Sequence, residues 1–581
     1  MIKNEWRLIQ TDANIELMSD TLKINPITAQ VLANRGLRSK KAAINFLSVN
    51  EVITHDGFLM KDMKKAAERI LKASKSEKII IYGDYDADGI MSTVILYKTL
   101  KSIGANVSYY IPHRQDEGYG LNSEAVKKLA LDGVDLIITV DNGISAINEV
   151  NEANALGVDV IIVDHHEPRF ELIGSTKTDI IPDAYAVVDP KQSECEYPFK
   201  EMCGAGIVLK LALIILGDNK ENSKEHSKEL ADEFFVLAGI ATLCDIVDLV
   251  DENRTIVKKA LKILNKNKLI NPGLGSLITL RGYLNKTIDT FTFGFVIGPC
   301  LNAAGRLDKA DIAVELLLSD SDTKKRLEMA DKLVFYNDKR KHLTTECAER
   351  VLESLSKPYD KVLVVTDTKA HESVAGIVAG RVKEATHRPT ILITCGDGAM
   401  KGSGRSIPNY NMFEALMKNK DLFERFGGHA MAAGLTILEE NIDVLRERLN
   451  KTCELSEEAF IPVIEIDKEI TFTEINFELV RELGAMAPYG KSNEEPTFSA
   501  YNLYTENVKM IPEKNTLIFT FSQNGKRFKA VAFGLNSKFD ELNIKAKGGF
   551  YLDAAFHIEL NLWNNNEEIQ LRLKDIELSN N

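Results

Sequence analysis

Acidic and histidine side chains directly follow three apolar segments of the chain. These segments lead into Asp84, Asp86 and Asp88 (KIIIYGDYDADG), Asp141 (DLIITVDNG), and Asp164, His165 and His166 (VDVIIVDHHEP). Carboxylates held a few ångströms apart repel one another, and a divalent cation removes that conflict. Carboxylate and imidazole ligands suit Mg²⁺ or Mn²⁺. So many acids favour two ions rather than one, and a pair of divalent ions is an arrangement for phosphoryl transfer.

The segments that must position these residues alternate between strand and helix. From about residue 64 to residue 188, short apolar runs such as KIIIY alternate with stretches of helical spacing. This alternation, with strands that are apolar throughout, predicts an α/β fold with a doubly wound parallel sheet. Ligands of such sheets bind at the carboxyl ends of the strands. We therefore expect the acids and histidines to converge on one edge.

Each pattern also has a structural explanation when it stands alone. A single DxD is often a turn or a helix cap, an Asp-Asn-Gly is usually a turn, and a His-His pair is usually surface or core. Three such ends in successive strand–helix units are difficult to assign to turns. The sequence therefore favours a metal site.

The composition narrows the class of protein. The chain has 581 residues, 44% of them hydrophobic and 27% charged, as in globular proteins of several domains. The longest apolar stretch, 207–216, contains Lys210 and is shorter than the about 20 residues of a membrane span. We expect no membrane segment and no signal peptide, because MIKNEWRLIQTDANIE holds no apolar run.

Cysteine usage and net charge add two further expectations. The 7 cysteines are scattered without a CxxC, which argues against disulfides and structural zinc and favours a reducing cytoplasm. The net charge of −13 argues against a nucleic-acid binder. A basic groove must therefore be local if one exists.

The chain divides into five predicted regions. We expect an N-terminal helical segment over 1–55, an α/β catalytic domain over 56–325, a connecting helix over 326–357, a second α/β domain over 358–455 and a β-barrel over 460–581. The connecting helix is expected because a charged stretch of about 30 residues, 323–356, holds no internal Gly or Pro. Short alternating segments such as TLIFTFS predict the small barrel.

The same residues carry a family resemblance. The ordered set GDYDADG, VDNG and VDHH resembles the DHH phosphoesterase superfamily, and ATLCDIVDL supplies a fourth element with Asp245. Further motifs resemble the RecJ single-stranded-DNA exonucleases: IPHRQDEGYGLN, GPCLNAAGRL, AHESVAGIVAGRV, KGSGRSIP, FGGHAMAAG and APYGKSNEEPTF. The match runs from about residue 25 to the end of the sequence, with its parts in the same order.

The resemblance implies a site for two Mn²⁺ or Mg²⁺ ions. Its ligands would be Asp84, Asp86, Asp88, Asp141, His165 and Asp245. Asp141 would bridge the ions, Asp164 would orient the histidines, and His166 would face the scissile phosphate. The division of the first three acids between the ions is left open.

The resemblance also implies groups that bind the nucleic acid. In the second α/β domain, which would close over the metal site as the family's DHH-associated domain, the candidates are His371, Ser403, Arg405 and the turn formed by Gly427, Gly428 and His429. In the catalytic domain, the candidates are Arg114, Tyr119, Asn302 and Arg306. Arginine suits bidentate phosphate binding, and glycine-rich turns let backbone amides approach an anion. The two histidines could instead cap loops.

The β-rich C-terminal segment resembles the family's OB-fold. Between residues 504 and 547 there are eight Lys/Arg against four Asp/Glu, interleaved with Phe519, Phe521, Phe528 and Phe533. Basic residues and aromatic rings on a small barrel favour single-strand binding by stacking. Strand aromatics more often form the core, and that explanation is the preferred one.

We therefore predict a single-stranded-DNA-specific exonuclease. By resemblance it would work 5′ to 3′, release 5′-mononucleotides by a two-metal mechanism, and serve DNA repair and recombination. Single-stranded DNA would be its substrate, with single-strand-binding protein or a helicase as candidate protein partners. Two alternatives stay open. A phosphoesterase for short oligonucleotides or small nucleotides is commonly shorter and lacks the barrel. An inactive single-strand-binding scaffold would have lost the DxD acids or a DHH histidine.

Overall fold

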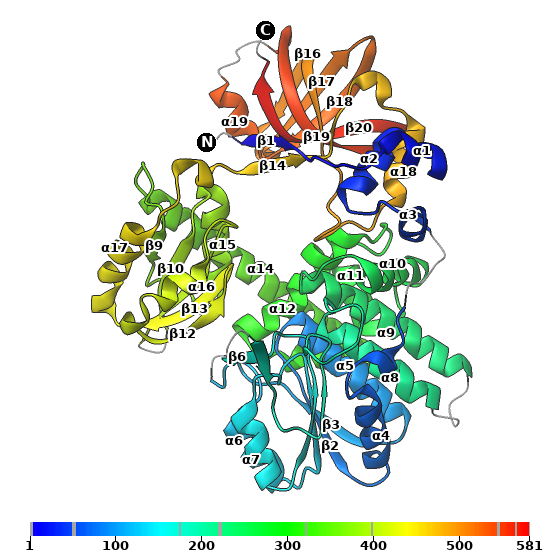
Figure 1. Ribbon diagram of the computed structural model, residues 1–581, viewed down its shortest axis with the longest axis vertical. Helices are drawn as coiled ribbons and strands as arrows, with labels where there is room; N and C mark the ends of the chain where they lie inside the picture. Colours follow the sequence, from blue (N-terminus) through cyan, green and yellow to red (C-terminus); the bar gives the residue numbers. More distant parts are fainter. Residues whose placement is uncertain are drawn as a thin grey trace. The chain divides into compact units, whose positions relative to one another are not determined.

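The computed structural model describes residues 4–48, 54–114, 116–173, 176–218, 224–319, 322–396, 399–542, 547–563 and 566–579. The chain forms two compact units. Figure 1 shows their helices and strands, coloured along the sequence. The terminal unit comprises Met1–Glu51, Leu343–Ala487 and Glu494–Asn581, and the central unit comprises Val52–His342 and Pro488–Asn493. Within the described ranges, no helix has the length and apolar character needed to cross a membrane.

The central unit is built on a five-stranded parallel sheet with the order β3-β2-β4-β5-β8. Its strands are β2 (Lys78–Tyr82), β3 (Asn106–Tyr110), β4 (Leu136–Val140), β5 (Asp159–Val163) and β8 (Ala186–Val188). In register, Ile80 pairs with Ile137, and Ile137 pairs with Val160. The carboxyl ends of the three strands that precede the acids therefore lie at the same edge, as predicted.

Helices cover both faces of this sheet. Ile79 and Ile81 pack into a core with α4 (Met63–Ala73), α5 (Ala87–Ser102), α8 (Gly204–Asp218) and α9 (Lys224–Cys244). Ile80 and Tyr82 pack into a second core with α6 (Ser123–Leu131) and α7 (Ile147–Ala155). Strand residues that alternate between two apolar cores explain why the strands are apolar throughout, and they confirm the doubly wound fold.

Further helices and a hairpin complete the central unit. They are β6 (Arg169–Ile173), β7 (Thr176–Ile180), α10 (Asp251–Lys266), α11 (Pro272–Leu280), α12 (Gly298–Leu307) and α13 (Asp311–Leu318). The predicted connecting helix is α14 (Thr323–Ser354).

The terminal unit contains the second α/β fold. Its sheet has the order β12-β13-β11-β10-β9. The strands are β9 (Leu363–Thr366), β10 (Thr390–Gly396), β11 (Ala399–Arg405), β12 (Phe423–His429) and β13 (Ala432–Ile437), with helices α15 (Ala375–Thr386), α16 (Met412–Met417) and α17 (Ile442–Thr452).

Two glycine-rich motifs in this sheet are strands rather than the predicted turns. Ser403 and Arg405 lie in β11, and Gly427–His429 end β12. Glycine allows close packing here, because a Cβ at Gly402 would lie 2.7 Å from Leu435 Cδ1. The turn prediction was wrong because the glycines serve strand packing instead of chain reversal.

The predicted C-terminal barrel is confirmed. Its strands are β16 (Phe498–Ile511), β17 (Thr516–Gln523), β18 (Lys526–Phe533), β19 (Phe550–Trp563) and β20 (Asn566–Leu578), with β15 (Lys468–Glu469) beside β16 and with helices α18 (Phe477–Ala485) and α19 (Asn536–Glu541). The barrel closes because β16 pairs with both β17 and β19. Phe519 and Phe521 are fully buried, so the core explanation is correct for these two rings.

The N-terminal residues also belong to the terminal unit. The predicted helices appear as α2 (Pro26–Asn34) and α3 (Lys40–Leu47), preceded by α1 (Ile15–Leu22). A strand that the sequence did not reveal, β1 (Glu5–Leu8), pairs in parallel with β14 (Val463–Ile466). Trp6 Nε1 donates a hydrogen bond of 2.8 Å to buried Asp575 of β20. The segment is therefore attached to the barrel.

Candidate active site

The predicted acids meet at the carboxyl edge of the central sheet. Asp84 follows β2 closely, Asp141 directly follows β4, and Asp164 directly follows β5. Strand β2 lies between β3 and β4, so the direction of winding changes at this point. The crevice outside such a switch point is the usual ligand site of open α/β sheets.

Potential metal ligands form three overlapping groups in the described residues. Within each group the ligand atoms lie within 4.8 Å of one another: Asp84, Asp86 and Asp141; Asp88, His165 and Asp245; and Asp141, Asp164, His165 and His166. His165 Nε2 lies 3.1 Å from Asp141 Oδ1, 3.7 Å from Asp245 Oδ2 and 3.8 Å from Asp88 Oδ2. The fold therefore brings all six predicted ligands together, with Asp141 shared between groups.

The first loop is held by backbone amides. Asp86 caps α5, because its Oδ1 accepts hydrogen bonds from the amides of Asp88 (2.9 Å) and Gly89 (3.1 Å). Asp86 is therefore a helix cap, as the structural explanation of a DxD predicts. Both amides bond to the same carboxylate oxygen, Oδ1, of Asp86. Asp88 accepts from the amides of Gly204 and Ala205, both at 2.7 Å, at the start of α8. The dipole of that helix favours a negative charge at its N-terminus.

Sequence reasoning did not identify the start of α8 as part of the candidate site. A Cβ at Gly204 would lie 2.9 Å from Asp141 Cβ, so only glycine fits there without displacing a metal-ligand candidate. The available signal was the run Gly-Ala-Gly at the start of a strongly apolar helix. Asp141 itself has a φ of 63°, in the left-handed region. Such a conformation costs a non-glycine residue about 1–3 kcal/mol and is found mainly at functional sites.

The electrostatics of the cluster favour a bound cation. Burial and the charge of Asp86 raise the pKa of Asp84 well above its usual value and that of Asp88 to about 7. Burial and the charge of Asp88 raise the pKa of Asp141 well above its usual value and that of Asp245 to about 8. A divalent ion would relieve this repulsion.

Three buried ligand atoms of this cluster have no hydrogen-bond partner among the described residues. They are Asp84 Oδ1 and both ring nitrogens of His165. Burial lowers the pKa of His165 to about 3, so its imidazole is neutral, as a metal ligand requires. The residues present therefore fit divalent metal ions.

Asp164 and His166 form a pair beside the ligand groups. Asp164 Oδ1 lies 2.7 Å from His166 Nδ1, and its Oδ2 accepts from the Ile144 amide at 2.9 Å. Burial alone would lower the pKa of His166, but the charge and hydrogen bond of Asp164 outweigh it and raise the pKa to about 9. The Tyr119 hydroxyl lies 3.3 Å from the His166 ring nitrogens and donates to the Asp141 carbonyl at 3.2 Å.

A fourth strand of the central sheet, β8, also ends in an acid that sequence reasoning missed. Asp189 directly follows β8 and is fully buried. Burial and the nearby charge of Asp164 raise its pKa to about 8. The signal was present in AVVDP, because the short apolar run 186–188 is itself a candidate strand and leads directly into the acid.

Positive charge gathers beside the acids. Burial, together with the charges of Arg114 and Arg340, lowers the pKa of Arg306 to about 10. The Arg114 guanidinium lies 5.0 Å from the centre of the Tyr85 ring. Arg340, on α14, was not among the predicted residues. Asn302 Oδ1 accepts a 2.6 Å hydrogen bond from the Ala87 amide, so Asn302 supports the DxDxD loop, and its phosphate contact stays a prediction.

The candidates of the second α/β fold share one sheet end. Arg405 of β11 and His429 of β12 both pair with Ala432 of β13. Ser403 and Gly427 likewise both pair with Gly434.

Gly428 and His371 have structural partners in this fold. Gly428 has a φ of 146°, and a Cβ there would lie 2.4 Å from the Ala432 carbonyl oxygen. His371 Nδ1 accepts from the Ser373 amide at 3.3 Å, so it caps the loop before α15. The DNA contacts of these residues stay predictions.

The barrel presents an aromatic row that the sequence did not predict. Tyr551, Tyr504, Ser522 and Arg527 pair in register across β19, β16, β17 and β18, and we call them the tyrosine row. The two tyrosine rings are 43% and 39% exposed, with centroids 5.3 Å apart. Phe533 is exposed, at 61%, but lies outside the row.

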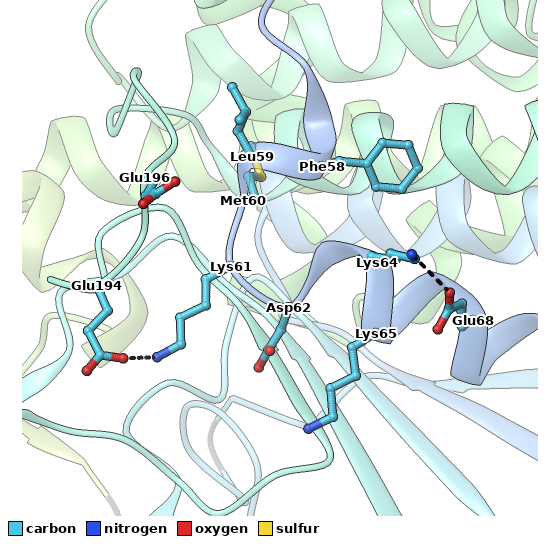
Figure 2. Close-up of a pocket in the computed structure, with 10 residues that line it drawn as sticks. All are labelled: Phe58, Leu59, Met60, Lys61, Asp62, Lys64, Lys65, Glu68, Glu194 and Glu196. Atoms are coloured by element: carbon cyan, nitrogen blue, oxygen red, sulfur yellow. Dashed lines mark hydrogen bonds and ion pairs between the residues drawn. The ribbon is translucent and has the colours of Figure 1, made fainter.

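A separate pocket of about 620 Å³ lies at the start of α4 (Figure 2). Lys61 pairs with Glu194 at 2.7 Å, and Lys64 pairs with Glu68 at 3.8 Å. None of the predicted site residues lines this pocket. Its mixed charge indicates no particular ligand.

Comparisons with known proteins agree with this geometry. Three family models match: the DHH family, N-terminal domain over residues 78–240, the DHHA1 domain over 360–455 and the RecJ OB domain over 466–575. The single-stranded-DNA-specific exonuclease RecJ of Bacillus subtilis is 37% identical over an alignment of 586 residues, which covers 99% of this chain and 71% of the relative. The RecJ exonuclease of Salmonella typhimurium is 30% identical, and the alignment covers 99% of this chain and 99% of the relative.

Solved structures agree as well. The crystal structure of RecJ from Thermus thermophilus in complex with Mn²⁺ matches 99% of this chain and 80% of its own, with a TM-score of 0.80 and 27% identity. Its complex with Mg²⁺ matches with a TM-score of 0.74 and 25% identity.

The fold and the site together define a phosphoesterase of the DHH class. With the matching second domain, barrel and full-length relatives, this chain belongs to the RecJ family of single-stranded-DNA-specific exonucleases. The predicted family and enzyme class are therefore confirmed.

Proposed function

We propose that this chain degrades single-stranded DNA from the 5′ end and releases 5′-mononucleotides, in DNA repair and recombination. The observation that carries the proposal is the convergence of six carboxylate and imidazole ligands on one sheet edge, in a chain of the RecJ family. Single-strand-binding protein and a helicase stay predicted partners.

The ligand groups suggest how two Mn²⁺ or Mg²⁺ ions would be held. Asp84 and Asp86 would bind one ion, and Asp88, His165 and Asp245 would bind the other, with Asp141 shared. When bound, such a pair activates a water molecule and neutralises charge on the phosphoryl oxygens. The Mn²⁺ and Mg²⁺ complexes of the Thermus thermophilus relative support this choice of metals.

The chain's own residues would orient the phosphate. His166, kept cationic by Asp164, would donate a hydrogen bond to a phosphoryl oxygen and stabilise the charge that develops there. Tyr119 would fix the ring of His166. Arg114, Arg306 and Arg340 would hold neighbouring phosphates of the strand, for which guanidinium groups are suited.

The terminal unit would contribute donors of its own. Ser403, Arg405 and His429 lie at one end of their sheet and would bind a terminal 5′-phosphate. The tyrosine row of the barrel would stack successive bases, and its Arg527 would meet the backbone.

Labelled single strands test the direction of cleavage and the alternatives. Strands with a 5′ label should release labelled mononucleotide at once, strands with a 3′ label should do so only late, and a chelator should stop both. Immediate release from the 3′ label would overturn the polarity. Cleavage of dinucleotides alone would indicate the small-substrate phosphoesterase, and binding without hydrolysis would indicate the inactive scaffold.

Mn²⁺ affinity should rise with pH. Asp88 and Asp245, with pKa values of about 7 and about 8, still hold protons at pH 6 that an ion must displace. One displaced proton changes affinity up to about tenfold per pH unit, so we expect roughly tenfold or more between pH 6 and pH 8. Titration calorimetry at both values measures this. Asp245→Asn, which lacks one of the protons, should show a shallower dependence, and equal affinity at both pH values would contradict the prediction.

Removing the tyrosine rings should weaken DNA binding. Stacking contributes about 1–3 kcal/mol per base, so Tyr504→Ala and Tyr551→Ala should each weaken oligothymidine binding by roughly 5- to 150-fold. Fluorescence anisotropy measures the affinity. Tyr504→Phe keeps the ring and should bind like the wild type. Phe533→Ala is the matched control, and a larger loss there than at the tyrosines would assign stacking to Phe533 instead.

A further inference from the structure

Six residues of the central unit come from the middle of the terminal unit's sequence. Pro488–Asn493 belongs to the central unit, whereas the residues before and after it belong to the terminal unit. The segment is part of the motif APYGKSNEEPTF. We call it the 488–493 loop.

The loop is closed by its own hydrogen bonds. Asn493 Nδ2 donates to the Pro488 carbonyl at 2.9 Å. The backbones of Gly490 and Asn493 exchange hydrogen bonds of 3.0 Å and 3.1 Å. Because Asn493 is fully buried, an alanine there would leave the Pro488 carbonyl without this donor.

The closed loop packs against the connection between α9 and α10. The Leu249 amide donates to the Lys491 carbonyl at 2.7 Å, and Leu249 is fully buried. A Cβ at Gly490 would lie 2.9 Å from Leu249 Cδ2, so the Leu249 side chain packs directly on the backbone of residue 490 because that residue is glycine. Lys491 Nζ also lies 3.0 Å from Asp248 Oδ1, but this pair is partly exposed and contributes little.

The same connection carries Asp245, the most distant metal-ligand candidate in sequence. Its amide is the last to bond back into α9, donating to the Ala241 carbonyl at 2.9 Å. The next residue, Ile246, has a φ of 58° and is 67% exposed, so it does not anchor the chain. Beyond it, Asp248 is held by Asn253 Nδ2 at 2.9 Å, and Leu249 is held by the 488–493 loop.

We propose that the 488–493 loop positions Asp245 for metal binding. Asn493 and Gly490 are positioning residues, because they act on Asp245 through Leu249. The inference rests on the proposed role of Asp245 as a ligand of one ion. Displacing the connection would move one carboxylate and leave Asp84, Asp86 and Asp141 in place.

Mn²⁺ titration of the full chain tests the proposal. Asn493→Ala should weaken one of two Mn²⁺ sites by roughly 10- to 100-fold, the usual effect of losing an outer support of a metal ligand. The other site should keep its affinity, and nuclease activity lost at low Mn²⁺ should return at saturating Mn²⁺. Asn271→Ala is the matched control, since Asn271 is also fully buried and its Nδ2 donates to the Leu317 carbonyl at 2.8 Å elsewhere in the central unit.

A second variant acts by steric pressure instead of lost hydrogen bonds. Gly490→Ala should push Leu249 and weaken the same Mn²⁺ site, whereas Gly217→Ala, where a Cβ meets nothing within 4 Å, should not. Wild-type affinity at both sites in folded Asn493→Ala and Gly490→Ala would overturn the proposal. The proposal would also be overturned if these variants bound neither ion and showed no cooperative unfolding transition, because the loop would then be needed for folding in general.

Asp245→Ala separates this inference from the proposed function. It should abolish the same single Mn²⁺ site. If it leaves both sites intact, the proposed metal role of Asp245 is wrong. If it removes one site while the two loop variants do not, only the positioning role fails.

Discussion

Replacing Asp141 by asparagine should lower the rate of DNA hydrolysis by at least about a thousandfold, equivalent to about 4 kcal/mol. Asp141 is the carboxylate shared between two ligand groups, and its Oδ1 lies 3.1 Å from His165 Nε2. Asparagine tolerates the φ of 63° and so preserves the backbone, but its amide is a poorer metal ligand. Hydrolysis of single-stranded DNA in Mn²⁺ measures the effect.

The same variant should be more stable than the wild type without metal. The folded-state pKa of Asp141 is raised well above its usual value. The wild type therefore loses stability as pH rises from the usual pKa of an aspartate, which applies in the unfolded state, to the raised pKa of the folded state. Asparagine carries no charge, so a chelator-treated Asp141→Asn should melt at a higher temperature near neutral pH. Asp135→Asn, at the opposite end of β4, is the matched control and should keep its activity. An active Asp141→Asn would remove Asp141 from the site.

Replacing His166 by alanine should lower the rate at saturating Mn²⁺ by roughly 100- to 1000-fold, the usual effect of losing a donor to a charged transition state. Its Nδ1 is occupied by Asp164, at 2.7 Å, so we expect it to act on the phosphate and not as a required ligand. Mn²⁺ affinity should therefore stay close to that of the wild type. A rate assay combined with Mn²⁺ titration separates the two effects.

His165→Ala is the natural comparison. It should lose Mn²⁺ affinity, because His165 Nε2 lies within 3.8 Å of Asp88, Asp141 and Asp245. If His166→Ala loses an ion and His165→Ala does not, the roles of the two histidines are reversed.

Local sequence determined the central sheet and the first part of the site. The apolar runs before Asp84, Asp141 and Asp164 are strands because each packs against helical cores on both faces. The carboxyl ends of parallel strands share an edge, so acids that directly follow them must lie close together. Strand pattern and position were therefore sufficient to predict this cluster. Asp245 follows a helix, and its place in the cluster was implied only by the family resemblance.

Tertiary structure alone decided the parts that depend on contacts without a periodic pattern. The amides of Gly204 and Ala205 reach Asp88 because the start of α8 meets the start of α5. The tyrosine row exists because barrel closure places β19 beside β16. The 488–493 loop reaches Leu249 from a position more than 200 residues away in the chain. Hydrophobic periodicity reports which face of an element is buried, but it does not report what that face meets.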